Sequence, residues 1–329
     1  MPQLLNKEVG AIGYGLMGLT WRPNPCPLEQ AFSAMRASLA AGCNAWNGGE
    51  FYGPPERNSL WLLKKYYEKY PEDAEKVVLS IKGAAKPDLS PDGSPEGVRR
   101  SVETCLEQMG GTGKIDLFEC ARKDPDVPLE TTLKALQELI QEGKIGGIAL
   151  SEVSAETIQQ GVKVAKIAAV EVELSLWATE PLTNGIAKVC KENDIPIIAY
   201  SPIGRGFLTG QIKSPDDIPE GDFRRFLPRF QPENFEANMK LVKQLEQLAG
   251  KKKCTPAQLA IGWVLALSKR PEMPTIIPIP GATTAERVEE NSAAVELSEQ
   301  EMKEIDGILE GFEAKGDRYH AHGMKHVNG

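Results

Sequence analysis

The amino-acid sequence predicts an α/β fold, the (β/α)8 TIM barrel, on three observations. Short apolar runs rich in Val, Ile and Leu alternate with longer amphipathic runs along the 329 residues. There are eight short runs, and their near-continuous apolar pattern is typical of parallel strands buried on both faces. A helical run follows each of them, which is the connection that a barrel of parallel strands requires.

The predicted strands are bounded by Gly, Pro, Asn or Ser, residues that favour turns. In chain order they are Val9–Tyr14, Cys43–Asn47, Val77–Ile81, Ile115–Glu119, Gly147–Leu150, Ala169–Leu174, Pro196–Tyr200 and Thr275–Ile279. The barrel helices are predicted at Leu28–Ala41, Asn58–Tyr70, Ser94–Met109, Pro128–Glu142, Ser154–Ala165, Leu182–Asn193 and Ala285–Ala293. Capping residues agree with these bounds: Ser154 suits a helix start, and Gly42, Gly110 and Gly143 suit helix ends.

Three further helices are predicted near the C-terminal end of this alternating pattern. Two helices, Glu233–Gly250 and Thr255–Ser268, are predicted between the seventh and eighth strands, and a third, Ser298–Gly311, follows the last barrel helix. No linker interrupts residues 1–329, so we expect a single domain with a loose tail from Lys315 onward. Gly204–Pro232 has four prolines and no regular pattern; after a seventh strand it predicts a lid on the catalytic face, or else a surface excursion.

Composition excludes several functions. The formal charge is −8, which argues against a general nucleic-acid binder, and no apolar run reaches the roughly 18 residues of a membrane span. The six cysteines stand singly, and no apolar signal core follows the N-terminus, so we expect a cytoplasmic protein, with the nucleus left open. All three histidines fall within the last ten residues, so neither a Ser-His-Asp site nor a metal site is predicted. No obligate protein partner is indicated.

A glycine motif near the N-terminus needs structural context. Gly13–Gly18 matches the G-x-G-x-x-G dinucleotide fingerprint, in which a helix must follow the glycines. Here Pro23, Pro25 and Pro27 follow at alternate positions and cannot continue a helix. We therefore expect these glycines to allow close approach of backbone at the end of the first strand, and not a Rossmann domain.

Polar residues at strand ends indicate a site on the barrel's carboxyl rim. Tyr52 follows the second strand and Lys82 ends the third; an ammonium beside a phenol lowers its pKa and makes it a usable proton donor. Taken alone, both residue types are common near strand ends. After the eighth strand, Gly281 and the following helix start form an anion cradle, and barrels of this kind frequently bind phosphate there, so a phosphorylated ligand is predicted.

Taken together, these segments resemble the aldo-keto reductases over nearly the whole chain. The resemblance is carried by Gly13–Gly18, Trp46–Gly53, Leu79–Lys82, Asp116–Glu130, Ala149–Ser154, Tyr200–Gly210 and Ile277–Asn291. It implies a barrel that binds NADPH across its carboxyl rim, passes a hydride to the carbonyl carbon of a small aldehyde and gives a proton to its oxygen.

The same resemblance assigns roles to individual residues. Tyr52 would be the proton donor and Lys82 its charged partner, with Asn47 where the family has an Asp. The residues that would contact the carboxamide and the ring of the nicotinamide are Ser151, Glu152, Glu171 and Tyr200, with the two Glu in place of the usual Asn and Gln. The pyrophosphate would be lined by Ser201, Ile203, Gly204 and Arg205, and the adenosine end by Gly281, Thr283, Arg287, Glu290 and Asn291.

Two departures qualify the resemblance. Asn47 replaces the family's Asp, so we expect Lys82 to lack its charge partner, and Ala121 replaces the His that orients the carbonyl. In these segments the chain resembles the fungal pyridoxal reductases, a branch that carries the same Asn and Ala at the two positions. This resemblance implies NADPH-dependent reduction of pyridoxal to pyridoxine in vitamin B6 metabolism. The alternatives are reduction of another aromatic or aliphatic aldehyde, and a non-catalytic sensor that only binds NADPH.

Overall fold

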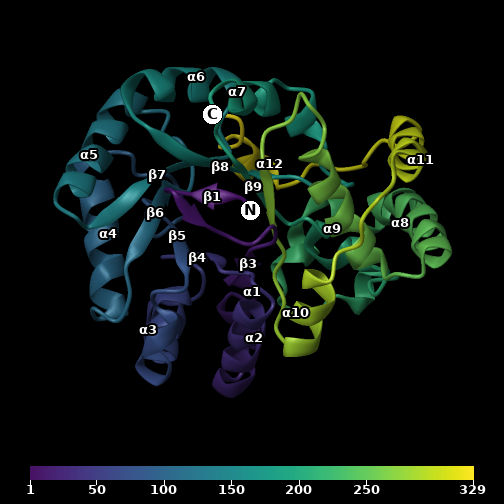
Figure 1. Ribbon diagram of the computed structural model, residues 1–329, viewed down its shortest axis with the longest axis horizontal. Coiled ribbons are helices and arrows are strands. Elements are labelled where there is room, and N and C mark those ends of the chain that lie inside the picture. The colour runs from purple at the N-terminus through teal and green to yellow at the C-terminus, as the bar shows by residue number, and fades with distance from the viewer.

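A computed structural model describes residues 1–329 and shows a barrel of eight parallel strands surrounded by helices (Figure 1). The strands are β3 (Tyr14–Gly15), β4 (Ala45–Gly49), β5 (Val78–Gly83), β6 (Ile115–Cys120), β7 (Ile145–Ser151), β8 (Ile167–Glu173), β9 (Ile197–Tyr200) and β10 (Ile276–Ile279), neighbours in that order. Gly15 pairs with Gly281, so the last strand meets the first. The predicted (β/α)8 barrel is therefore confirmed.

Ten of the twelve helices match the predicted runs. The helices are α1 (Met17–Thr20), α2 (Leu28–Ala40), α3 (Ser59–Lys69), α4 (Pro95–Met109), α5 (Leu129–Gln141), α6 (Ala155–Val164), α7 (Ile186–Glu192), α8 (Pro232–Lys252), α9 (Pro256–Leu267), α10 (Ala285–Ser292), α11 (Glu299–Glu310) and α12 (Ala321–Met324). Of these, α8, α9 and α11 are the predicted extra helices, whereas the short helices α1 and α12 were not predicted. None of the helices combines the length and the apolar composition that crossing a lipid bilayer requires.

The first barrel strand is shorter than predicted. The sequence predicts a strand over Val9–Tyr14, whereas β3 has only Tyr14 and Gly15. Its partner β10 contains Pro278, and Pro280 follows directly. Their carbonyls accept hydrogen bonds from Gly13 N (2.9 Å) and Gly15 N (3.3 Å). Because proline has no N–H, no bond returns, and the ladder at the closure of the barrel is incomplete.

A small hairpin closes the opposite end of the barrel from the predicted site. It consists of β1 (Gln3–Leu4) and β2 (Lys7–Glu8), and Figure 1 shows it across the barrel interior. Leu4 is 2% exposed and packs with inward-facing residues of several strands, among them Leu117 and Ile277. A Cβ on Gly147 would lie 2.5 Å from the side chain of Leu5, so glycine is needed there. This apolar seal leaves the carboxyl end as the open face.

The irregular segment Gly204–Pro232 folds into four short 3₁₀ helices: Gly204–Thr209, Pro215–Asp217, Phe223–Phe226 and Pro228–Phe230. Aromatic packing fixes it to the barrel. Phe207 stacks on Trp177 with ring centroids 4.2 Å apart, and Phe230 meets the same indole edge-on at 5.3 Å. Phe223 stacks on Trp21 at 6.3 Å, on the carboxyl side of the barrel. A lid function of this segment stays a prediction.

Candidate active site

Tyr52 lies in the loop after β4, where its ring is held from several sides. Its side chain stacks on Trp21 with centroids 5.9 Å apart, and Thr20 Oγ1 donates a hydrogen bond to the Tyr52 carbonyl oxygen (2.6 Å). A Cβ on Gly49 would lie only 2.9 Å from the Tyr52 ring, so the close approach of this ring requires glycine. The residue is 7% exposed, and its phenol therefore has one fixed position on the barrel rim.

Lys82 is the last residue but one of β5, lies inside the barrel and is 4% exposed. Its ammonium lies 2.8 Å from Glu171 of β8 and 3.3 Å from Glu119 of β6, and it donates a hydrogen bond to Ser151 Oγ at 2.7 Å. The expectation that Lys82 lacks a charge partner is therefore wrong. Alternate residues of parallel barrel strands point inward. Carboxylates from two other strands, β6 and β8, therefore supply the negative charge that Asn47 lacks.

Asn47 completes this buried cluster. Its Nδ2 donates to Glu171 Oε2 at 2.7 Å and to Glu119 Oε1 at 3.0 Å, so the amide joins the two carboxylates. Burial, followed by repulsion from Glu119, raises the pKa of Glu171 to about 8, and Lys82 opposes both effects. We refer to Lys82, Asn47, Glu119 and Glu171 as the inner cluster.

Two opposing influences act on the pKa of Lys82. Burial is the largest influence on the pKa of Lys82 and lowers it, but the attraction of Glu119 and Glu171 outweighs burial and holds the ammonium protonated. Burial also raises the pKa of Tyr52 well above its usual value; Lys82 lowers it, and the two carboxylates raise it again. The lowering by Lys82 that the sequence predicts is present, but the net shift is upward.

Glu119 was not among the predicted site residues. Its signal in the sequence is an acidic residue within the apolar strand Ile115–Cys120, where the strand pattern predicts burial. A buried carboxylate requires a cationic or hydrogen-bonded partner, and that requirement marks both Glu119 and Asp116, which is buried in the same strand. Which partner each of them has depends on strand order, which a local pattern does not contain.

A second cluster surrounds the residues that the resemblance places at the nicotinamide, and the C-terminal tail (residues 315–329) enters it. Arg318 donates to Glu152 Oε2 at 2.8 Å and to Glu173 Oε2 at 3.3 Å. The Tyr319 hydroxyl lies 2.8 Å from that of Tyr200. The tail expected to be loose is thus docked on the barrel rim, because Arg318 finds two buried carboxylates there.

Glu152 is the most strongly held member of this second cluster. Its backbone has φ +53°, a left-handed conformation uncommon for a side-chain-bearing residue, and its oxygen Oε1 accepts a bond from Glu173 N at 2.9 Å. Burial alone would raise its pKa, but the Arg318 guanidinium brings the pKa of Glu152 down to about 2. Asn328 N donates to the Glu152 carbonyl at 2.8 Å, so the chain end is tied to the same residue.

The remaining predicted cofactor residues lie after β9 and β10, which are adjacent strands. Ser201, Gly204 and Arg205 have φ between +52° and +58° and form a tight turn with Ile203, in which Arg205 pairs with Glu173 at 3.0 Å. After β10, Gly281 and Thr283 precede α10, and Arg287, Glu290 and Asn291 lie within it. Arg287 is exposed and pairs with Glu290, and Asn291 is 6% exposed.

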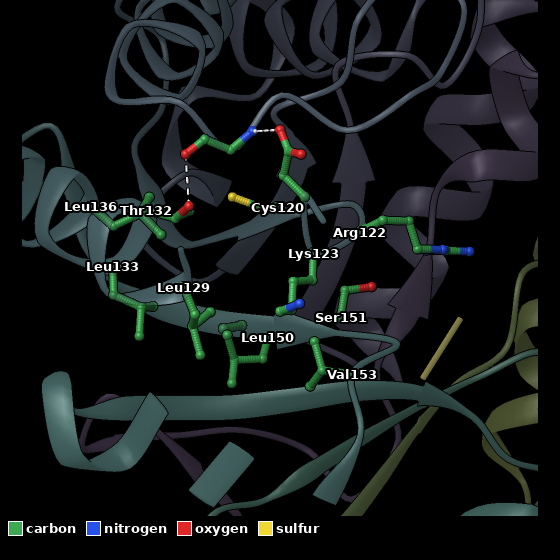
Figure 2. A pocket seen from close by; sticks show the side chains of 13 residues that line it. Cys120, Arg122, Lys123, Leu129, Thr132, Leu133, Leu136, Leu150, Ser151 and Val153 are labelled. Atoms are coloured by element: carbon green, nitrogen blue, oxygen red, sulfur yellow. Dashed lines mark hydrogen bonds between the residues drawn. The ribbon is translucent and has the colours of Figure 1, made fainter. Parts of the chain in front are cut away.

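A pocket lies behind the rim, between β6, β7 and α5, and Figure 2 shows its lining. Leu129, Leu133 and Leu150 make it apolar, and Thr132 Oγ1 closes one side by donating to Gly93 O at 2.7 Å. Ser151 is at its edge. Figure 2 shows the Arg122 guanidinium extending away from these leucines.

Comparison with known proteins agrees with this geometry. The model of the aldo/keto reductase family matches residues 11–310. The chain is an aldo/keto reductase. The protein named "Probable pyridoxal reductase 2" of Schizosaccharomyces pombe is 44% identical and covers 97% of both chains. A Saccharomyces cerevisiae protein, whose name assigns it provisionally as a pyridoxal reductase, is also 44% identical, over 93% of this chain and 95% of its own.

A solved structure supports the fold of this aldo/keto reductase. The glycerol dehydrogenase of Gluconobacter oxydans superposes with a TM-score of 0.80 over 95% of both chains, at 22% identity. At that identity the likeness concerns the barrel alone.

Proposed function

We propose that this aldo/keto reductase reduces pyridoxal to pyridoxine with NADPH, as a step of vitamin B6 metabolism. The observation that carries the proposal is the buried Tyr52 phenol within the electrostatic influence of an ammonium, Lys82, that two carboxylates keep charged. The similarity to the two yeast proteins supports the choice of substrate.

The protein's part in the reaction is proton donation. NADPH, when bound, would supply the hydride to the aldehyde carbon. Tyr52 would give its hydroxyl proton to the carbonyl oxygen, and the phenolate left behind would be stabilised by Lys82. Glu119 and Glu171 keep Lys82 protonated, and Asn47 holds these carboxylates in place.

An aromatic, activated aldehyde suits this site. Tyr52, Trp21 and Phe223 form a stacked row of rings, with Trp21 between the other two. Pyridoxal is flat, and its pyridine nitrogen withdraws electrons from the aldehyde, so its reduction needs less help from an orienting group. Ala121 stands where the family has its His, and this substrate would tolerate that loss.

The residues after β9 and β10 fit NADPH. The tight turn Ser201–Arg205 follows β9, and Arg287 offers an exposed guanidinium in the first turn of α10 after the neighbouring strand β10. A guanidinium suits a 2′-phosphate, so Arg287 would select NADPH over NADH. Arg287→Ala should weaken NADPH binding roughly tenfold and leave NADH binding nearly unchanged. Equal losses for the two cofactors would remove this argument.

The Tyr52→Phe variant tests the proposal as a whole. With pyridoxal and NADPH, we expect the loss of reduced-nicotinamide absorbance to slow by roughly a hundredfold or more, since general acid catalysis contributes at least that factor. NADPH binding, measured by fluorescence, should stay within about twofold because ring and packing are retained. A variant that keeps most of its rate would overturn the role of Tyr52, and a panel of other aldehydes beside pyridoxal identifies the substrate.

A further inference from the structure

Three guanidinium groups surround the ring of Tyr319 at the barrel rim, and one of them differs from the others. The carbons of Arg205, Arg122 and Arg318 lie 4.6, 5.6 and 6.0 Å from the ring centroid. Arg205 and Arg318 pair with Glu173 and Glu152. Arg122 has no carboxylate oxygen within 4.0 Å, and its one hydrogen bond goes to the carbonyl oxygen of its neighbour Ala121, at 2.6 Å.

Arg122 is close to the proposed proton donor. It follows β6 directly, on the carboxyl rim, and is partly buried. Burial lowers the pKa of its guanidinium, but Tyr319, Tyr200, Glu152 and Tyr52 are near enough to raise it overall, so the group stays charged. No carboxylate oxygen lies within 4.0 Å of this charged group, so an anionic ligand would form the direct ion pair that the guanidinium lacks in this chain.

We propose that Arg122 is a specificity-determining residue, whose guanidinium binds an ionised oxygen next to the aldehyde group of an aromatic substrate. This inference rests on the proposed reductase function. The small side chain of Ala121 adds no group that competes for the carbonyl oxygen. Tyr319 already presents an aromatic ring to Arg122, so the position accepts an aromatic group. A guanidinium can also bind an ionised oxygen through two N–H groups.

The location of Arg122 explains how the oxygen would orient the substrate. An anchor just after β6, on the same rim as Tyr52, would hold the aromatic ring by a group adjacent to the aldehyde, so that the carbonyl oxygen is left to face the phenol. This is the positioning task of the missing His, performed through the substrate's own substituent. Aldehydes that lack the ionised oxygen would bind without this constraint.

A matched pair of substrates tests the anchor. Arg122→Gln should lower kcat/KM for 2-hydroxybenzaldehyde, at a pH that ionises its hydroxyl, by roughly tenfold or more. For 2-methoxybenzaldehyde, which has no ionisable oxygen, the change should stay within about twofold. Lys123→Gln is the control, because it removes one positive charge from the next position, whose side chain lines the pocket in Figure 2. Equal losses for both aldehydes in Arg122→Gln would overturn the proposal.

Binding without turnover separates this inference from the proposed function. By calorimetry, the 2-hydroxybenzoate anion should bind Arg122→Gln roughly tenfold more weakly than wild type, and Lys123→Gln like wild type. NADPH affinity should be unchanged in both variants. Unchanged 2-hydroxybenzoate binding would refute the anchor even in an active reductase, whereas the expected weakening in a protein that reduces no aldehyde would refute only the reductase function. A loss of NADPH affinity would assign Arg122 to the cofactor and overturn the proposal.

Discussion

Restoring the family's aspartate at position 47 should harm this protein. In Asn47→Asp, an oxygen replaces the nitrogen that now donates to Glu171 Oε2 (2.7 Å) and to Glu119 Oε1 (3.0 Å). Three carboxylates would then face one ammonium, that of Lys82, in a site that is closed to water. Either the third carboxylate stays charged and repels the other two, or it takes up a proton.

The magnitude follows from the two bonds that are lost. Hydrogen bonds to charged groups contribute about 1.5 to 3 kcal/mol each, which gives about 3 to 6 kcal/mol for the pair. Breaking a buried ionic cluster costs a similar amount, about 3 to 5 kcal/mol. Since protonation relieves the repulsion, the pKa of the new carboxyl would be raised. The loss should therefore grow as the pH rises above the unfolded Asp pKa of about 4, by at most about 1.4 kcal/mol per pH unit.

Urea unfolding at several pH values measures this loss, and a compensating variant makes the experiment specific. Asn47→Asp combined with Glu171→Gln returns the cluster to two carboxylates and one amide. The amide introduced at position 171 would donate to the new aspartate, while its oxygen would still accept from Lys82. The double variant should recover all but about 1.5 kcal/mol of the wild-type stability, so the two changes couple strongly. If the loss of unfolding free energy in the double variant equals the sum of the losses in the two single variants, the reasoning is refuted.

Three further predictions concern stability. Arg318→Gln removes the cationic partner of buried Glu152 and one of the two partners of Glu173, which keeps Arg205. It should cost about 3 kcal/mol in urea unfolding, with earlier tryptic cleavage of the tail; a loss below about 1 kcal/mol would contradict this. Glu171→Gln should reduce a decline in wild-type stability between pH 4.5 and about 8, because burial and repulsion from Glu119 raise the pKa of this carboxyl and make its ionisation in the fold costly. If both proteins show the same pH slope by urea unfolding, Glu171 is not the group responsible. Leu4→Ala should lower the unfolding free energy by about 2 to 5 kcal/mol through the cavity it opens, as calorimetry would show; a change near zero would mean that the hairpin seal is dispensable.

Local sequence patterns predict most of this fold because barrel strands and helices differ in length and period over a few residues. The predicted length of the first strand is wrong for a long-range reason. Pro278 and Pro280 lie far along the chain, and they lack the N–H groups that would extend the hydrogen-bond ladder of β3. The docking of the tail escapes prediction for a similar reason. Nothing near Arg318 in the sequence indicates that Glu152 and Glu173 are in reach, since these residues are separated from it by more than a hundred positions.

The predicted site residues also divide into those whose position follows from the local pattern and those whose partners depend on distant parts of the chain. Lys82 and Ser151 each lie at the end of an apolar run, and strand order alone puts them on one rim, where they lie 2.7 Å apart. Glu171 was predicted as a cofactor contact, yet its oxygens are taken by Lys82 and Asn47. The resemblance supplies a position for each residue but not the partners it has in this chain.

Position-by-position comparison therefore misreads Asn47 as a lost charge. What an ammonium beside a phenol requires is a nearby negative charge, and this requirement belongs to the cluster and not to one strand. In this chain the amide stands on β4 and the carboxylates stand on β6 and β8, so the exchange conserves the chemistry while it alters two of the family's positions. If the carboxylates on β6 and β8 have replaced the charge of the family's Asp, Asn47 and Glu171 can change only together. The double variant measures this coupling.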